Sequence, residues 1–188
     1  GLWSVLRSSE DEVMKGSLLI TLYENLRWKT ISPQGFRDEM LAYLPNESNS
    51  LLFSMALSYL GDCQRIFPSD SRPLEQALWK IVTTNPVSQH RLQAFRLYRS
   101  IADSEEAVQR LYTLWQERKA PKDCTLSESD YIGLSYILAM HLPEKADKII
   151  ATQLSRIQNP DRKKEYQFIS PSVSPRKAER DSVFASLL

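Results

Sequence analysis

The chain has 188 residues and an almost balanced charge, with 24 lysines and arginines against 23 aspartates and glutamates. A net charge this close to zero provides no field to hold a nucleic-acid backbone or an anionic membrane, so neither is expected as a partner. No apolar run reaches the roughly 18 residues of a membrane-spanning helix. Five glycines and two cysteines are too few for a glycine-rich all-β fold or a disulfide framework.

Apolar residues recur at spacings of three and four along the chain, which predicts helices from end to end. The first such stripe predicts a helix over residues 10–28. Ser32 and Pro33 have the N-cap and first-turn pattern of a second helix, which is expected to stop near Pro45. Residues 47–66 leave little polar face, so this third helix is expected to be central.

Further helix pairs follow. The partner of the central helix carries the apolar residues between Leu74 and Val82, and Ser104 is an expected N-cap within the next pair. A fourth pair lies on either side of Pro143. The first helices of the pairs start near residues 10, 47, 86 and 127, and this spacing of about 40 residues is in the range of HEAT and armadillo pairs.

This repetition predicts an all-α fold, specifically an α-α superhelix (solenoid) of antiparallel helix pairs that is HEAT/armadillo-like. An ordinary helical bundle is the alternative, because any stack of antiparallel helices with short turns has similar spacing.

The sequence changes character after the fourth pair. Residues 1–158 are expected to form the helical-repeat pairs, and residues 159–188 a tail and final helix of the same domain. Within the tail, residues 159–165 are polar and favour a turn. A last helix is expected to open at Ser174-Pro175.

The apolar residues of the tail are expected to pack against the preceding helix pair. They are Phe168, Phe184 and Leu187. The final helix ends without a capping signal, which predicts truncation at the C-terminus within a larger protein. A start at glycine instead of methionine agrees with this, and it leaves the compartment open because a targeting signal could have been removed.

The motifs of common catalytic centres are missing. There is no HExxH, and the two histidines lie on different expected helices, His90 facing solvent and His141 partly buried as a structural residue. There is no G-x-S-x-G turn and no glycine-rich phosphate loop. Cys63 is expected in the core and Cys124 in a loop. The sequence therefore gives no catalytic residue, no metal ligand and no cofactor for this chain.

Two basic features remain, and both are interpreted first as solvated surfaces diluted by acidic neighbours. One comprises Arg91, Arg96, Arg99 and Arg110, and the other is Arg162-Lys163-Lys164. The alternative is that arginines on a concave surface hold the C-terminal carboxylate of a peptide by bidentate hydrogen bonds.

Three segments of the tail resemble a known family. They are Asn-Pro-Asp-Arg at residues 159–162, Phe-Ile-Ser-Pro-Ser-Val-Ser at 168–174, and Glu-Arg-Asp-Ser-Val-Phe-Ala-Ser-Leu at 179–187. In order and spacing they resemble the C-terminal helical domain of zinc aminopeptidases related to aminopeptidase N, the gluzincin aminopeptidases. The preceding 158 residues agree with that domain only as helix pairs of suitable length.

The resemblance implies that the catalytic apparatus lies in other domains of the parent protein. In that family an N-terminal β domain and a thermolysin-like domain come first, and HExxH with a distant glutamate binds zinc. The helical domain is non-catalytic, closes over the catalytic chamber and helps accommodate peptide substrate. Its implied partners are the catalytic domain of the same polypeptide and the peptide, and zinc is implied only for the parent enzyme.

Four residues match the family-like tail and are candidates for the substrate face or for an interdomain contact. They are Asp161, Arg162, Arg180 and Asp181. The simpler interpretation is that they form structural ion pairs or occupy helix ends.

Two other functions stay open on the sequence. The chain could be a free-standing helical-repeat scaffold that binds a protein or peptide on its concave face. The parent could also be a catalytically inactive relative that kept the architecture and lost the zinc ligands.

Overall fold

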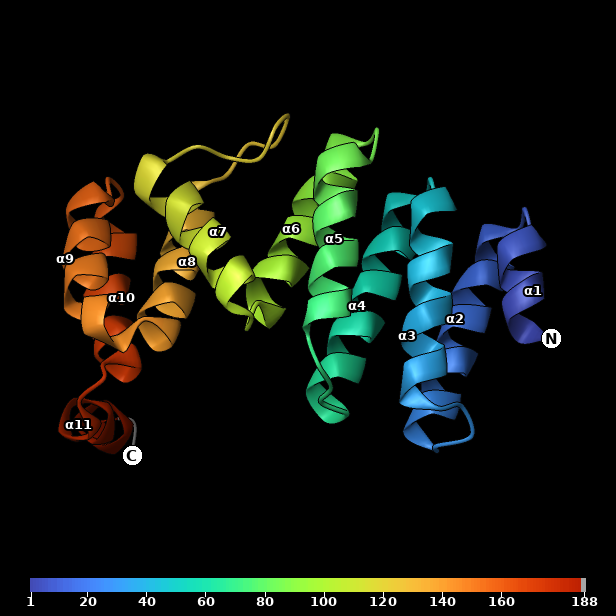
Figure 1. Cartoon of the computed structure of the whole chain (residues 1–188), viewed down its shortest axis with the longest axis horizontal. Helices are drawn as coiled ribbons and strands as arrows, with labels where there is room; N and C mark the ends of the chain where they lie inside the picture. Colours follow the sequence, from blue (N-terminus) through green and yellow to red (C-terminus); the bar gives the residue numbers. More distant parts are fainter. Residues whose placement is uncertain (187–188) are drawn as a thin grey trace. The chain divides into compact units, whose positions relative to one another are not determined.

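The computed structural model describes residues 1–186, and these residues form eleven α-helices and three 3-10 helices with no strand (Figure 1). The expected all-α class is therefore confirmed for the described residues. Contacts divide them into two compact units, one of residues 1–102 with Lys122–Cys124 and the other of residues 103–121 with residue 125 onward. None of the described helices is both long and apolar enough to cross a bilayer.

The first unit has six α-helices joined by short connections. They are α1 (Leu2–Ser8), α2 (Glu12–Arg27), α3 (Pro33–Tyr43), α4 (Ser50–Ile66), α5 (Arg72–Thr84) and α6 (Ser88–Ile101), with the 3-10 helix η1 (Leu44–Asn46) after α3. Helices α2, α4 and α6 pack side by side in succession, whereas α3 packs on α2 and α4, and α5 on α6 (Figure 1). Only α1 was not predicted from the sequence.

Helix α4 is the centre of this unit, as its weak polar face predicted. It contacts α2, α3 and α6, and the residues that it buries are Leu52, Phe53, Ala56, Leu57, Leu60 and Cys63. Each fully buried Leu or Phe contributes roughly 1.5 to 3 kcal/mol relative to exposure. The expected core position of Cys63 is confirmed.

Side-chain caps set where several helices begin. The hydroxyl of Ser32 accepts a hydrogen bond from the N–H of Gly35 at 3.1 Å, and Pro33 opens α3. The hydroxyl of Ser104 accepts one from the N–H of Ala107 at 3.2 Å. Both N-caps were predicted from the sequence, because a short polar side chain satisfies an N–H group that lacks a partner in the first turn.

The second unit contains the remaining five α-helices. They are α7 (Glu105–Glu117), α8 (Glu128–His141), α9 (Ala146–Arg156), α10 (Pro160–Ile169) and α11 (Lys177–Ser186), with η2 (Pro143–Lys145) before α9 and η3 (Ser170–Val173) after α10. Helix α8 packs on α7 and α9, α10 packs on α9, and η3 contacts α8, α10 and α11.

The polar segment expected as a turn is the start of a helix. Asn159 caps α10 by accepting hydrogen bonds from the N–H groups of Asp161 and Arg162, both at 3.0 Å, and Pro160 occupies the first turn. The prediction was wrong because α10 has no apolar stripe and buries a single side chain, Tyr166. The Asn159 cap and Pro160 in the first turn are sufficient to start the helix without an apolar stripe.

The expected packing of the tail phenylalanines is also wrong. Phe168 is 54% exposed and Phe184 is 67% exposed. Helix α11 buries none of its described residues, and its main packing partner is η3. The third residue of that prediction, Leu187, lies outside the described residues. A buried aromatic side chain that joins the tail to the preceding pair is Tyr166 instead.

Candidate functional site

Two of the four candidate residues, Asp161 and Arg162, lie in the first turn of α10. Their backbone N–H groups are bound by Asn159, and the Arg162 guanidinium lies 3.4 Å from the Glu128 carboxylate at the start of α8. The N–H of Gln158 donates to Glu128 at 2.8 Å, and this bond, together with Arg162, lowers the pKa of Glu128. Both residues therefore occupy helix-end positions, as the simpler interpretation predicted.

The other two candidates lie on α11. The Arg180 guanidinium donates to the carbonyl oxygen of Ser174 at 2.7 Å, which fixes the connection between η3 and α11. Asp181 is exposed. Within residues 1–186, no hydrogen bond or ion pair joins the α10 candidates to the α11 candidates, so the structure does not bring the four residues into one site.

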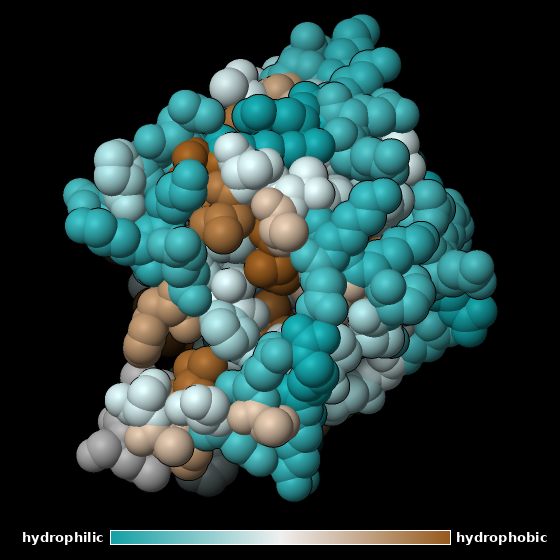
Figure 2. All heavy atoms as spheres, turned by 90° about the vertical axis from the view of Figure 1, so that its left-hand side faces the viewer, coloured by the Kyte–Doolittle hydropathy of each residue, from teal (hydrophilic) through white to brown (hydrophobic). Residues whose placement is uncertain are grey.

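A pocket does lie close to the tail, and we call it the tail recess. It has a volume of about 270 Å³ and lies between α9 and the η3–α11 connection. Its lining residues include Ala146, Ile150, Ala151 and Leu154 from α9, and Pro171 and Pro175 from the tail. Figure 2, which views the chain from the α9 side, shows apolar atoms exposed in a recess surrounded by hydrophilic atoms.

Charged residues border the tail recess. The Arg176 guanidinium binds the Asp147 carboxylate through two hydrogen bonds of 2.8 Å and also bonds to Glu179. Hydrogen bonding to Arg176 lowers the pKa of both carboxyl groups, and the carboxylates in turn raise the pKa of Arg176. A pocket with an apolar lining and with one cation and two carboxylates at its border is suited to a ligand such as a peptide, which has an apolar side chain beside a polar backbone.

The sequence did not identify Arg176 or Asp147 as functional candidates. They are 29 positions apart, and only folding brings them together. A local signal did exist, because Arg176 and Glu179 have the three-residue spacing of a helical ion pair. In the folded chain Arg176 lies just before the first residue of α11.

A second pocket, of about 430 Å³, lies between α4 and α6 in the first unit. Leu57, Leu97 and Ile101 provide its apolar lining, and Asp62 and Arg65 are among its polar residues. Asp62 is engaged twice, since it accepts a hydrogen bond from the Tyr23 hydroxyl at 3.1 Å and pairs with Arg65. Both charged side chains, Asp62 and Arg65, therefore already have partners.

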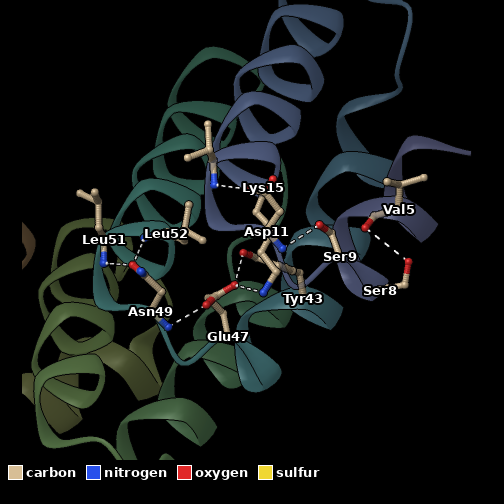
Figure 3. Close-up of polar contacts among 11 residues, drawn as sticks. Val5, Ser8, Ser9, Asp11, Lys15, Tyr43, Glu47, Asn49, Leu51 and Leu52 are labelled. Atoms are coloured by element: carbon tan, nitrogen blue, oxygen red, sulfur yellow. Dashed lines mark hydrogen bonds and ion pairs between the residues drawn. The ribbon is translucent and has the colours of Figure 1, made fainter.

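Glu47 is a buried carboxylate of the first unit (Figure 3). It accepts hydrogen bonds from the Tyr43 hydroxyl, from the N–H of Asn49 at 2.7 Å and from the Lys15 ammonium at 3.1 Å. Burial by itself raises the pKa of Glu47, but these three donors outweigh burial and lower it. The network joins α2 to the segment between α3 and α4, which is a structural role.

The expectation that His90 faces solvent is wrong. Its side chain is fully buried and stacks on Phe53, with ring centroids 4.0 Å apart, and its Nε2 lies 3.0 Å from the Ser50 hydroxyl. Burial lowers the pKa of His90, although the nearby Glu47 charge opposes the effect. The error arose because the first turn of α6 packs against α4. His141 is partly buried, as predicted.

The arginines considered for carboxylate binding are already engaged. Arg91 lies 3.4 Å from the Asp123 carboxylate, and Arg110 lies 2.6 Å from Glu106. Arg96 and Arg99 also take part in interactions. Arg110 belongs to the second unit and the other three to the first.

Neither cysteine has the surroundings of a nucleophile. Burial raises the pKa of both Cys63 and Cys124, which keeps them as thiols. Among residues 1–186, no three His, Cys, Asp or Glu side chains converge so that they could hold a metal ion. The zinc that the resemblance implies thus has no candidate ligand set in the described part of this chain.

Comparisons with known proteins identify no relative of this chain. No protein-family model matches the sequence, no curated protein matches it, and no solved structure matches the fold. Any function assigned to the chain therefore depends on the geometry described above and on the resemblance carried by the tail.

Proposed function

We propose that this chain is the non-catalytic helical domain of a zinc aminopeptidase related to aminopeptidase N. In this role it closes over the catalytic chamber of the same polypeptide and helps accommodate the peptide substrate. The observation that carries the proposal is the tail, where the three family-like segments occur in order and include the two ends of α10, all of η3 and most of α11.

The arrangement of the helices supports this proposal. In the first unit, α2, α4 and α6 pack in succession while α3 and α5 lie against them, and such alternation is typical of stacked helix pairs. We therefore propose a HEAT/armadillo-like superhelix as the architecture of the whole domain.

The tail recess supports a role in accommodating substrate. An extended peptide needs apolar pockets for its side chains and polar groups near its backbone, and the tail recess combines an apolar lining with Arg176, Asp147 and Glu179. We propose that it receives an apolar side chain of the peptide at a distance from the reacting bond.

The alternative function is a free-standing scaffold that binds a protein or peptide. The repeated packing of helices in the first unit is compatible with it, because a stacked-helix architecture alone would suffice for such a scaffold. The two functions differ in whether a zinc peptidase precedes this chain in its reading frame.

The first test is the sequence of the parent reading frame. The proposal requires HExxH and a distant glutamate upstream of Gly1, and a frame that lacks both would contradict an active peptidase and favour the scaffold or the inactive relative. The second test uses purified proteins. The full parent protein should contain one zinc and hydrolyse aminoacyl-anilides, whereas this chain alone should bind no stoichiometric zinc and show no turnover.

A further inference from the structure

Two arginines in the second unit lie on aromatic rings and have no acidic partner. The guanidinium carbon of Arg118 lies 5.4 Å from the centre of the Tyr131 ring, and that of Arg156 lies 4.8 Å from the centre of the Trp115 ring. Neither forms an ion pair with a carboxylate among residues 1–186. We call these two residues the arginine pair.

The contacts of Arg156 hold it in one place. It donates to the carbonyl oxygens of Trp115 at 3.0 Å and of Gln116 at 3.3 Å, both in the last turn of α7. The indole N–H of Trp115 donates to the buried Gln153 at 2.8 Å, which fixes the ring beneath the guanidinium. These bonds use two of the five N–H groups of Arg156 and leave the others available.

Arg118 has an unusual backbone conformation. It ends α7 in the left-handed conformation, with φ of 53°. Glycine is the usual residue at such a helix end, because a side chain is disfavoured at positive φ. The positive charge of an arginine suits the carbonyl end of α7, and the side chain places this cation over Tyr131.

The charges of the arginine pair are not compensated. Arg156 is bonded to carbonyl oxygens in the last turn of α7, and Arg118 is the C-cap of the same helix, so the two cations lie at the same helix end. Burial and then the charge of Arg118 lower the pKa of Arg156. The two guanidinium groups carry two positive charges, and the carbonyl end of α7 offsets about half of one. The buried Asp130, next to Tyr131 in sequence, accepts hydrogen bonds from the backbone and hydroxyl of Ser127 in the capping box of α8.

We propose that the arginine pair is a binding site for a phosphate monoester. Such a group carries about −1.5 to −2 charges at neutral pH, which matches the uncompensated charge of the pair, whereas a carboxylate supplies one. Its oxygens can accept the remaining N–H groups of both guanidinium planes, which the aromatic rings hold in place before the ligand binds. The site is separate from the tail recess and does not depend on the proposed peptidase function.

The test is a titration of the chain with inorganic phosphate at constant ionic strength, followed by NMR at the indole N–H of Trp115. Phosphate should produce a saturable shift, and acetate should bind at least about tenfold more weakly. Glycerol phosphate and a short phosphoserine peptide should also bind, and the tighter of the two identifies whether the phosphate is carried by a small molecule or by a protein.

Two matched variants decide the assignment. Arg118→Gly removes one cation and relieves the positive φ, so the variant should fold and should lose at least about tenfold in phosphate affinity. Lys29→Gly removes a cation at another left-handed position, with φ of 60°, and should bind phosphate like the parent chain. The absence of a saturable shift, equal affinity for acetate, or unchanged binding in Arg118→Gly would each overturn the proposal.

Discussion

The hydroxyl of Tyr166 on α10 lies 2.9 Å from the hydroxyl of Ser135 on α8, and both side chains are buried. The Tyr166 ring also stacks on Tyr136, with centroids 5.0 Å apart. Ser135 has a second bond, to the carbonyl oxygen of Ile132 at 2.7 Å. Through this ring, the tail is attached to the helix pair that precedes it.

The attachment predicts a graded loss of stability at position 166. Tyr166→Phe keeps the ring and removes one hydrogen bond, so it should lower the free energy of unfolding by about 1 kcal/mol. Tyr166→Ala removes a buried ring and should lower it by about 3 to 5 kcal/mol. Urea unfolding followed by circular dichroism measures both. Equal losses in the two variants would show that the hydroxyl, and not the ring, holds the tail in place.

The exposed face of α11 predicts that two substitutions on this helix lower the free energy of unfolding by different amounts. Phe184→Ala should change the free energy of unfolding by no more than about 0.5 kcal/mol, because the side chain has little packing to lose. Arg180→Ala removes the bond to the Ser174 carbonyl and should cost about 1 kcal/mol. Matched urea melts test this order, and a larger loss from Phe184→Ala would mean that its ring is packed in solution.

The bonds of Arg176 predict how α11 is retained. The helix has no buried residue among those described, and Arg176 ties its start to Asp147 on α9. Arg176→Gln should therefore increase amide hydrogen exchange in residues 177–186 and leave α8 unchanged. Arg72→Gln, which removes an exposed bidentate pair with Asp70, is the control. Unchanged exchange in α11 would mean that other contacts retain it.

The Glu47 network predicts a loss of stability in acid. The pKa of Glu47 is lowered in the folded chain. The stability that Glu47 contributes to folding is therefore fully present above its unfolded pKa of about 4.3, and it is lost as the pH falls through its folded pKa. Glu47→Gln should lower the free energy of unfolding at neutral pH by about 1 to 3 kcal/mol. Its deficit relative to the parent chain should shrink as the pH approaches about 3. Glu24→Gln, at an exposed pair with Arg27, should show neither effect.

Burial of His90 predicts a second pH effect, at higher pH. Its pKa is lowered on folding, so the unfolded chain binds a proton first as the pH falls below about 6.5, and stability decreases from there down to the folded pKa. His90→Phe retains a ring beside Phe53 and should remove this slope. His141→Gln should retain it. Urea midpoints measured between about pH 5 and 8 distinguish the two variants.

The sequence predicted those features of the fold that depend on neighbouring residues. Ser32 and Ser104 signalled the starts of α3 and α7 because an N-cap acts within three residues. For α10, Asn159-Pro160 carried the same kind of signal. A turn was nevertheless predicted, because the segment has no apolar stripe. Periodicity reports burial of a face, and α10 buries a single side chain.

The sequence could not predict features that depend on contacts between distant helices. The burial of His90 requires the stack on Phe53, 37 positions earlier in the chain. The tail recess requires the approach of Arg176 to Asp147. Residue types limit which contacts are favourable, but they do not determine which surfaces meet.

The close approach of α4 and α6 has a consequence for related sequences. A Cβ atom added at Gly61 would lie 2.8 Å from a methyl carbon of Leu97, closer than real Cβ atoms approach, so one of the two side chains would have to shift. Homologues should therefore show covariation at these positions, with alanine or serine at position 61 accompanied by a smaller or differently branched residue at position 97.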